Sequence, residues 1–159
     1  MNYLITFRTY GTWLHGDERG TVDARHNGVG EPLLENLPHW KNQAKKQMKG
    51  EAVAFDVAQR QCVAETLREV AAFRRWEISA LAVQTNHVHV VVIADCAPEK
   101  VMTDFKSYTT RRLRERVLVP LGVPIWSQHG STKYLNSRVS LLAACQYVME
   151  NQADLTDCP

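Results

Sequence analysis

The chain has 159 residues, of which 45% are hydrophobic and 23% charged, which is the composition of one folded globular domain rather than of a disordered or fibrous protein. No apolar run approaches the roughly 20 residues that cross a bilayer, and the first residues lack the pattern of a cleaved leader, so we expect a cytoplasmic protein without a membrane segment. The net charge of +2 is too small to indicate a nucleic-acid partner by itself.

The first half of the predicted domain, which we place over residues 1–159, contains a strand, a long loop and a helix. Residues 3–9 alternate apolar and polar side chains, which is typical of a half-buried strand. Glycines and prolines interrupt residues 10–50, so we predict a long loop insertion there, either a binding loop or an insertion anchored by a buried Trp13. Apolar residues then recur at helical spacing over residues 51–74.

The second half contains a hairpin, a helix, a short strand and a last helix. Residues 76–83 and 87–94 alternate as two strands around a short polar turn. A helix begins near Pro98, keeps its apolar spacing as far as Val117 and ends at Pro120 and Gly122. Residues 132–135 form a short strand, and Ser137 or Ser140 caps the last helix.

The order β-α-β-β-α-β followed by a helix predicts an α+β, ferredoxin-like (RRM-like) fold, with an antiparallel sheet and two long helices on one face. The strand over residues 87–94 can be central in such a sheet. Its histidines would then lie on the open, accessible face of the sheet rather than in the core under the helices.

Two histidines, His87 and His89, lie two residues apart in a run of β-branched residues. Because a strand alternates its side chains with a period of two, both imidazoles project from one face while Val88 and Val90 project from the other. Such a pair supplies part of a coordination sphere for a divalent metal and needs at least one further protein ligand. The alternative is a pair of ordinary polar residues on a solvent-facing sheet.

A tyrosine and an amide lie on one face of the predicted last helix, because Tyr147 and Asn151 are four residues apart. A tyrosine can attack a phosphorus atom when a metal polarises the phosphate, and an amide oxygen can complete the metal's coordination. The alternative is an amphipathic closing helix in which Tyr147 is half-buried.

Several motifs occur together in a fixed order: Asn86-His87-Val88-His89 in a strand, Lys106-Ser107 in a basic helix, Trp126 before a loop, and Gln146-Tyr147-Val148-x-x-Asn151-Gln152 near the end. The combination resembles the single-tyrosine HUH (His-hydrophobe-His) transposases of small bacterial insertion sequences, including the relatives associated with repetitive extragenic palindromes (REP). The opening, from Phe7-Arg8-Thr9-Tyr10-Gly11-Thr12-Trp13-Leu14 through Gly16-Asp17-Glu18-Arg19-Gly20, also looks like one branch of that family.

The resemblance implies a role for each matching residue. His87 and His89 would bind a divalent metal, Mg²⁺ or Mn²⁺, with Asn151 or the adjacent Gln152 as third ligand. Tyr147 would be the nucleophile that forms a 5′-phosphotyrosine on hairpin-bearing single-stranded DNA. Members of the family are dimers, so the resemblance also implies a homodimer, in which the tyrosine helix can serve either subunit.

The residues expected to contact DNA are basic or aromatic. We name Lys106, Arg111 and Arg112 for backbone phosphates, and Trp13 and Arg19 for the loop's contacts with DNA. The basic residues can instead be solvated helix faces.

Three alternatives stay open at this stage. Tyr108 and Tyr134 are rival nucleophiles, although the first reads as helix packing and the second lacks an amide four residues later. The chain can also be a domesticated binder of palindromic DNA hairpins that does not cleave, or a metal hydrolase with a water nucleophile.

Overall fold

A computed structural model describes residues 1–12 and 52–151. Within them, one antiparallel sheet has the strand order β2-β3-β1-β4. The strands are β1 (Asn2–Thr9), β2 (Glu77–Val83), β3 (His87–Ile93) and β4 (Trp126–Tyr134), and the helices are α2 (Val57–Arg74), α3 (Pro98–Glu115) and α4 (Arg138–Glu150). This is the predicted order, so the α+β, ferredoxin-like fold is confirmed.

Two predictions extend beyond the described residues. The single domain over residues 1–159 stays a prediction, and most of the loop predicted over residues 10–50, with Trp13 and Arg19, lies outside the described ranges. In residues 1–12 and 52–151, no helix is long and apolar enough to cross a membrane.

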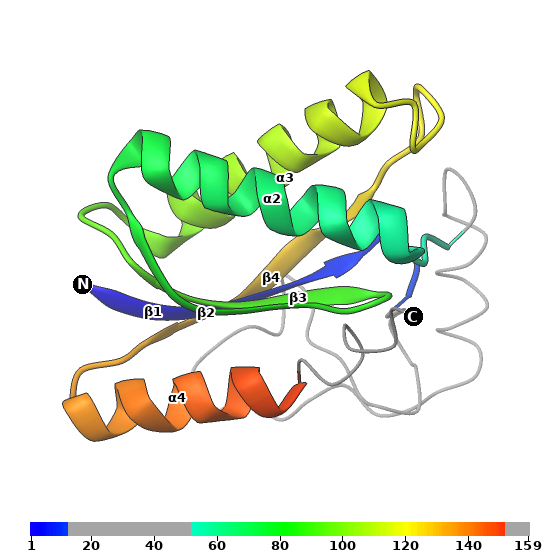
Figure 1. The fold of residues 1–159 in the computed structure, drawn as a ribbon. Helices are drawn as coiled ribbons and strands as arrows, with labels where there is room; N and C mark the ends of the chain where they lie inside the picture. The colour runs from blue at the N-terminus through cyan, green and yellow to red at the C-terminus, as the bar shows by residue number, and fades with distance from the viewer. Residues whose placement is uncertain (13–51, 152–159) are drawn as a thin grey trace.

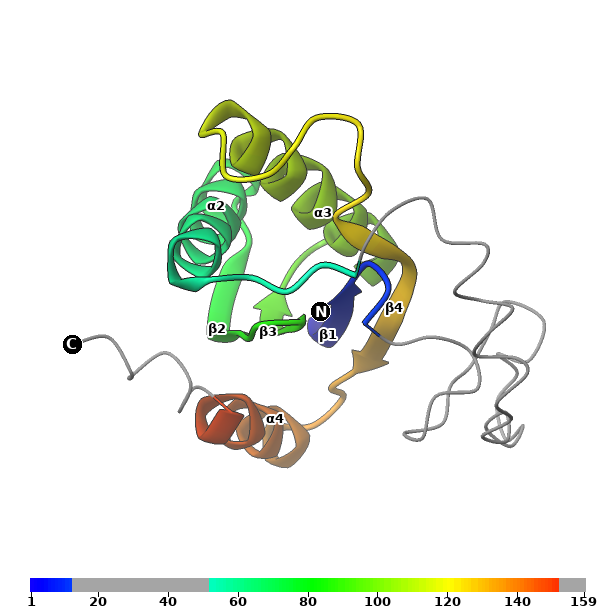
Figure 2. The ribbon, with the colours of Figure 1, turned by 90° about the vertical axis from the view of Figure 1, so that its right-hand side faces the viewer.

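The helices form two layers, one on each face of the sheet. Figure 1 shows α2 and α3 together on one face and α4 on the other, and the turned view in Figure 2 shows the same three layers. The larger core lies between the sheet and the α2/α3 pair, where the most deeply buried side chains include Ile5, Phe7, Leu67, Val88, Val90 and Phe105. A smaller cluster lies under α4 and consists of Ala80, Ala82, Val91, Leu135, Ala144 and Val148.

The first long helix begins six residues later than its apolar spacing predicts, at Val57 rather than at residue 51. Asp56 caps it: its Oδ1 accepts a hydrogen bond of 2.7 Å from Gln59 N, while Gln59 Oε1 accepts one of 2.8 Å from Asp56 N. The residues before the cap bond elsewhere, since Val53 N donates to Tyr10 O and Phe55 N donates to Thr85 O. This extended segment is therefore tied to the sheet.

The last strand is longer than predicted, because β4 covers Trp126–Tyr134 rather than residues 132–135. It is one of the two edge strands of the sheet, and most of its residues are exposed, so the apolar alternation that marks a half-buried strand is absent. Gly130 is needed inside it, because a Cβ there would clash with the Met102 sulfur and would lie 2.6 Å from Thr6 O.

Helix α3 ends at Glu115, before the predicted boundary. Val117 follows in the left-handed region with φ 56° and is 86% exposed, so it is not the core position that its helical spacing indicates. The hydrogen bond from Leu118 N to Leu113 O, 2.9 Å long, closes this end of the helix.

The expectation that the histidines lie on an open face is wrong. Helix α4 packs on that face, and His89 is only 6% exposed. The reason is that the last helix buries Ala144 and Val148 against this side of the sheet instead of extending the chain away from it.

Candidate functional site

The paired histidines project from one face of β3, as the alternation predicts. Their ring centroids are 4.7 Å apart, with an angle of 72° between the rings. Val88 and Val90 project from the other face and are fully buried in the larger core. A central strand with its reverse side packed in this way holds both imidazoles on a rigid base.

The ring of His87 is oriented by the residue before it. Asn86 Oδ1 lies 2.6 Å from His87 Nδ1. Because a carbonyl oxygen only accepts, Nδ1 is the nitrogen that carries the proton, and the lone pair that can bind a metal is then on Nε2.

The ring of His89 is oriented from the neighbouring strand. Thr6 on β1 is the register partner of His89, and its Oγ1 lies 2.8 Å from His89 Nδ1. A threonine hydroxyl can donate or accept, so when it accepts from Nδ1 the Nε2 lone pair of His89 can also bind a metal.

The environment of His89 favours its neutral form. Burial is the main cause that lowers the pKa of His89 below its ordinary value of 6.5, and the positive charge of Arg8 lowers it further. A neutral imidazole is the form that binds a metal ion. The site therefore keeps this ligand competent at neutral pH.

Helix α4 brings Tyr147 to the histidines. The ring centroid of Tyr147 lies 5.3 Å from that of His89 in the same chain, in an edge-on arrangement of 68°. Tyr147 is 48% exposed, so part of its side chain is open to a substrate. The predicted association of the carboxy-terminal tyrosine with the histidine strand is thus present in the described structure.

The position of α4 follows from small residues and a capped start. Ala80 and Ala82 of β2 allow the helix to approach the sheet closely, and Val148, next to Tyr147, is fully buried against them. Ser137 caps the first turn, where its Oγ accepts a hydrogen bond of 3.0 Å from Ser140 N.

Asn151 lies directly after α4, as the residue that ends the helix. Its side-chain Nδ2 donates a hydrogen bond of 2.8 Å to Tyr147 O, so this end of the amide is engaged with its own helix. Gln152, the alternative third ligand, lies outside the described residues.

The two imidazoles form an incomplete ligand set within residues 1–12 and 52–151, where no group of three His, Cys, Asp or Glu side chains is placed to hold a metal ion. The donors that are present still fit a divalent cation, since both Nδ1 atoms have oxygen partners and the Nε2 atoms are then the nitrogens that would serve as ligands. Completing the coordination requires another donor, and an amide oxygen is chemically suitable.

The rival tyrosines lie away from the imidazoles. Tyr134 is the register partner of Tyr3, and their rings meet edge-on at 5.1 Å, which places Tyr134 on the α2/α3 side of the sheet. Tyr108 lies on α3 under the guanidinium of Arg111, whose Cζ is 5.3 Å from the ring centroid.

Within residues 52–151, Lys106 and Arg112, which were predicted to bind DNA, do not lie beside the histidines. Lys106 Nζ donates to the carbonyls of Ser127 at 2.9 Å and His129 at 3.1 Å, and burial lowers the pKa of Lys106 to about 8. Arg112 forms an ion pair of 2.7 Å with Glu69 of α2. Both residues are therefore part of the packing around α3.

Sequence reasoning missed the two residues that orient the imidazoles. Asn86 could have been recognised, because it stands directly before His87 and the groups that hydrogen-bond the other nitrogen of a histidine ligand are carboxylates, amides or carbonyls. Thr6 gave no local signal, since its pairing with His89 depends on the register between β1 and β3.

The fold and the site together define an α+β domain whose central strand presents two imidazoles to a tyrosine from a separate helix. The sequence model of the family described as "Transposase IS200 like" matches residues 46–151. The chain therefore belongs to the IS200-like transposase family, a family of DNA-cleaving enzymes.

A solved structure shows the same fold. The chain is similar to a REP-associated tyrosine transposase solved bound to a REP hairpin, with 12% identity and a TM-score of 0.54 over 99% of this chain and 73% of that one. A Deinococcus radiodurans protein assigned to the transposases shows 14% identity and a TM-score of 0.45, over 96% of this chain and 90% of that one. The curated proteins contain no significant match.

Proposed function

We propose that this transposase nicks and joins single-stranded DNA with Tyr147 as its nucleophile. The observation that carries the proposal is the edge-on contact of 5.3 Å between Tyr147 and His89, which associates an exposed phenol with a pair of oriented imidazoles. A half-exposed tyrosine beside potential metal ligands is suited to an attack on a phosphodiester.

The proposed step conserves the phosphodiester bond energy. The Tyr147 oxygen forms a bond to phosphorus while the bond from phosphorus to the 3′ oxygen breaks. The phenol loses its proton and the departing 3′ oxygen gains one, which leaves a 5′-phosphotyrosine and a free 3′-hydroxyl. A 3′-hydroxyl from another end can reverse the reaction and so join two strands, and no nucleotide cofactor is consumed.

His87 and His89 would hold a divalent ion, Mg²⁺ or Mn²⁺, through their Nε2 atoms, with an amide oxygen of Asn151 or Gln152 as the third ligand. The ion would supply polarisation of the phosphate oxygens, which stabilises the charge of the transition state. Asn86 and Thr6 would keep the imidazoles oriented for that role.

A DNA hairpin with a single-stranded flank is the proposed substrate. The support is the family and the similar REP-associated tyrosine transposase that was solved bound to a REP hairpin. Lys106 and Arg112 remain proposals as phosphate contacts, and they would have to act from the α3 side of the sheet.

We also propose a homodimer. On α4, Val139, Leu142 and Met149 are 78%, 60% and 62% exposed, and this apolar stripe beside the site supports contact with a second copy. Sedimentation velocity of the wild type and of Leu142→Glu tests it, since the variant should shift a dimer to a monomer. A wild type that sediments as a monomer at micromolar concentration would contradict the proposal.

The alternatives make different predictions. A non-cleaving binder of hairpins would retain the substrate without any nick in Mg²⁺ or Mn²⁺. A hydrolase with a water nucleophile would nick the strand but leave no protein attached to the product.

The test is a denaturing gel of the protein incubated with a labelled hairpin oligonucleotide and Mn²⁺. The wild type should give a covalent protein-DNA adduct and Tyr147→Phe should give none. The matched control is Tyr134→Phe, because Tyr134 is 50% exposed, close to the 48% of Tyr147, and lies on the other side of the sheet. An adduct that survives in Tyr147→Phe would show that the nucleophile is another residue.

A further inference from the structure

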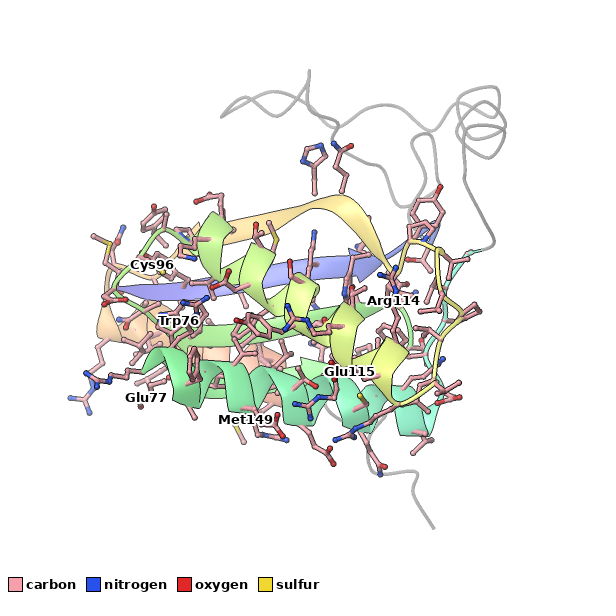
Figure 3. All side chains as sticks on the ribbon, turned by 90° about the horizontal axis from the view of Figure 1, so that it is seen from above. Trp76, Glu77, Cys96, Arg114, Glu115 and Met149 are labelled. Atoms are coloured by element: carbon pink, nitrogen blue, oxygen red, sulfur yellow. The ribbon has the colours of Figure 1, made fainter. Side chains whose placement is uncertain are left out.

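An open groove lies along α3, on the opposite face of the sheet from the histidines. It encloses about 480 Å³ between the carboxy-terminal half of the helix and the loop that leads to β4, and is lined by Ser107, Thr110, Arg111, Arg114, Glu115 and Leu121. Figure 3 looks onto this side and shows Arg114 and Glu115 near the end of α3, beside that loop.

The arginines of α3 fall into two sets. Arg112 and Arg116 face α2, where they pair with Glu69 at 2.7 Å and with Glu65 at 2.9 Å. Arg111 and Arg114 line the groove, and within residues 1–12 and 52–151 neither has a carboxylate within 4.0 Å. The Arg111 guanidinium also stacks on the Tyr108 ring, a contact that leaves its charge uncompensated. The first set is neutralised by packing, whereas the positive charge of the second remains available to a ligand.

The polar groups of the groove are suited to an anion. Arg111 and Arg114 offer guanidinium donors, which match the oxygens of a phosphate, and Ser107 and Thr110 add hydroxyl donors one helical turn away. The single carboxylate, that of Glu115, lies 3.7 Å from Arg112 Nε, which offsets its charge.

Arg114 contacts the loop that forms the other wall of the groove. One of its terminal nitrogens donates to Val123 O at 3.1 Å, which fixes the guanidinium against the loop. Its Nε is buried and has no hydrogen-bond partner among the described residues. The Nε of Arg74 is buried in the same way, so what distinguishes Arg114 is its position in the lining of the groove.

The wall of the groove is held in place before any ligand binds. Val119 is 8% exposed, and Leu118 O accepts a hydrogen bond of 2.8 Å from Gln59 Nε2 of α2. Leu121 is nevertheless 80% exposed, so a fixed loop presents an apolar side chain next to two arginines. That combination suits a sugar-phosphate chain, which has both charged and apolar surfaces.

We infer that this groove binds a phosphate of the DNA substrate, with Arg111 and Arg114 as its ligands, on the face of the sheet away from the cleavage site. The inference rests on the proposed function in taking hairpin DNA as the substrate. The contact acts on affinity and not on the chemical step, because the histidines and Tyr147 lie on the α4 side.

The test measures binding of a fluorescein-labelled DNA hairpin with a single-stranded flank, in EDTA so that no cleavage occurs, over a series of salt concentrations. Arg111→Gln should weaken binding about fivefold and reduce the slope of log K against log salt by roughly 0.7 to 0.9, the value for one lost phosphate contact. Arg111 is exposed, so its loss should leave the fold intact.

Arg116→Gln is the matched control, since it removes the same charge from the same helix but faces Glu65. It should change affinity less than twofold. Arg114→Lys keeps the positive charge but loses the planar guanidinium with its paired donors. It should also weaken DNA binding, as Arg111→Gln does.

Two outcomes overturn the inference. If Arg111→Gln and Arg116→Gln lose the same amount of DNA affinity, only the net charge of the protein matters. If neither variant loses DNA affinity, the groove does not bind DNA and an acidic protein segment is its candidate ligand. Failure of the proposed function is distinguishable, because it would appear as a wild type that does not bind the hairpin or gives no Tyr147-dependent adduct.

Discussion

Tyr147 on α4 and His89 on β3 meet edge-on within one chain, with 5.3 Å between their ring centroids. The contact depends on two packing relationships: the burial of Val148 under α4 and the register that sets Thr6 against His89. Substitutions at Val148 and at Thr6 should therefore have different effects: the first should affect the position of the nucleophile, and the second the binding of the metal.

Removing the oxygen partner of His89 should weaken the metal site. Thr6→Val keeps the β-branched shape but deletes the hydroxyl at 2.8 Å from His89 Nδ1. Loss of such a partner lowers metal affinity by roughly 10- to 100-fold. Titration calorimetry with Mn²⁺ measures it, with Thr132→Val as control because Thr132 bonds Glu99 on the surface. Equal affinities for both variants would show that Thr6 does not support a ligand.

Loosening α4 should impair adduct formation. Val148→Ala removes two methyl groups from a fully buried position and should lower the free energy of unfolding by about 2 kcal/mol. It should also slow formation of the covalent adduct, because Tyr147 loses its fixed position, while Mn²⁺ affinity stays unchanged. The control Val57→Ala makes the same change at an exposed position at the start of α2, and should alter neither quantity appreciably. Normal adduct rates in Val148→Ala would contradict this dependence.

The stability of the protein should fall on acidification because of His89. Its pKa is below 6.5 in the folded state, so the unfolded chain takes up the proton first as the pH decreases. The free energy of unfolding should then decline as the pH falls below about 6.5 and level off below the folded pKa. Urea midpoints between pH 5 and 8 measure this, and His89→Gln should lose this part of the decline. An identical pH profile in the variant would rule His89 out as the source.

Lys106 should also make the free energy of unfolding increase with pH, but in the alkaline range. Burial lowers its pKa to about 8, whereas the unfolded side chain titrates near 10.5, so between these values the unfolded state binds more protons. Stability should rise with pH over this window in the wild type relative to Lys106→Met, which has no titrating group there. Urea unfolding at pH 7.5, 9 and 10.5 gives the comparison, and a difference that does not change with pH would contradict it.

The parts of the site that could be predicted are those encoded in local periodicity. Alternation of the valines with the histidines was sufficient to place His87 and His89 on one face of a strand. Their covering by α4 was not predictable in this way, because it depends on the contact of Ala144 and Val148 with residues on other strands. Only the order of motifs, compared with a known family, associated Tyr147 with that strand.

The other differences between the predicted and observed elements lie in an edge strand and at the end of a helix. The sequence Trp126-Ser127-Gln128-His129-Gly130 carries no apolar alternation because it lies in an edge strand, and so its strand was missed. Val117 fits a helical stripe, but the chain leaves the helix one residue earlier, at Arg116, and exposes it. In both places tertiary position overrides local pattern.

Residues 9–12 and 52–56 are joined by hydrogen bonds next to the sheet. Tyr10 O accepts from Val53 N at 2.9 Å, and Thr9 Oγ1 donates to Val53 O at 2.6 Å and also lies 3.2 Å from Asn86 O. The end of β1, the segment before α2 and the turn before β3 are therefore held together by hydrogen bonds of their own. Since the side chain of Asn86 in that turn also orients His87, a substitution that breaks this junction should disturb the imidazole as well.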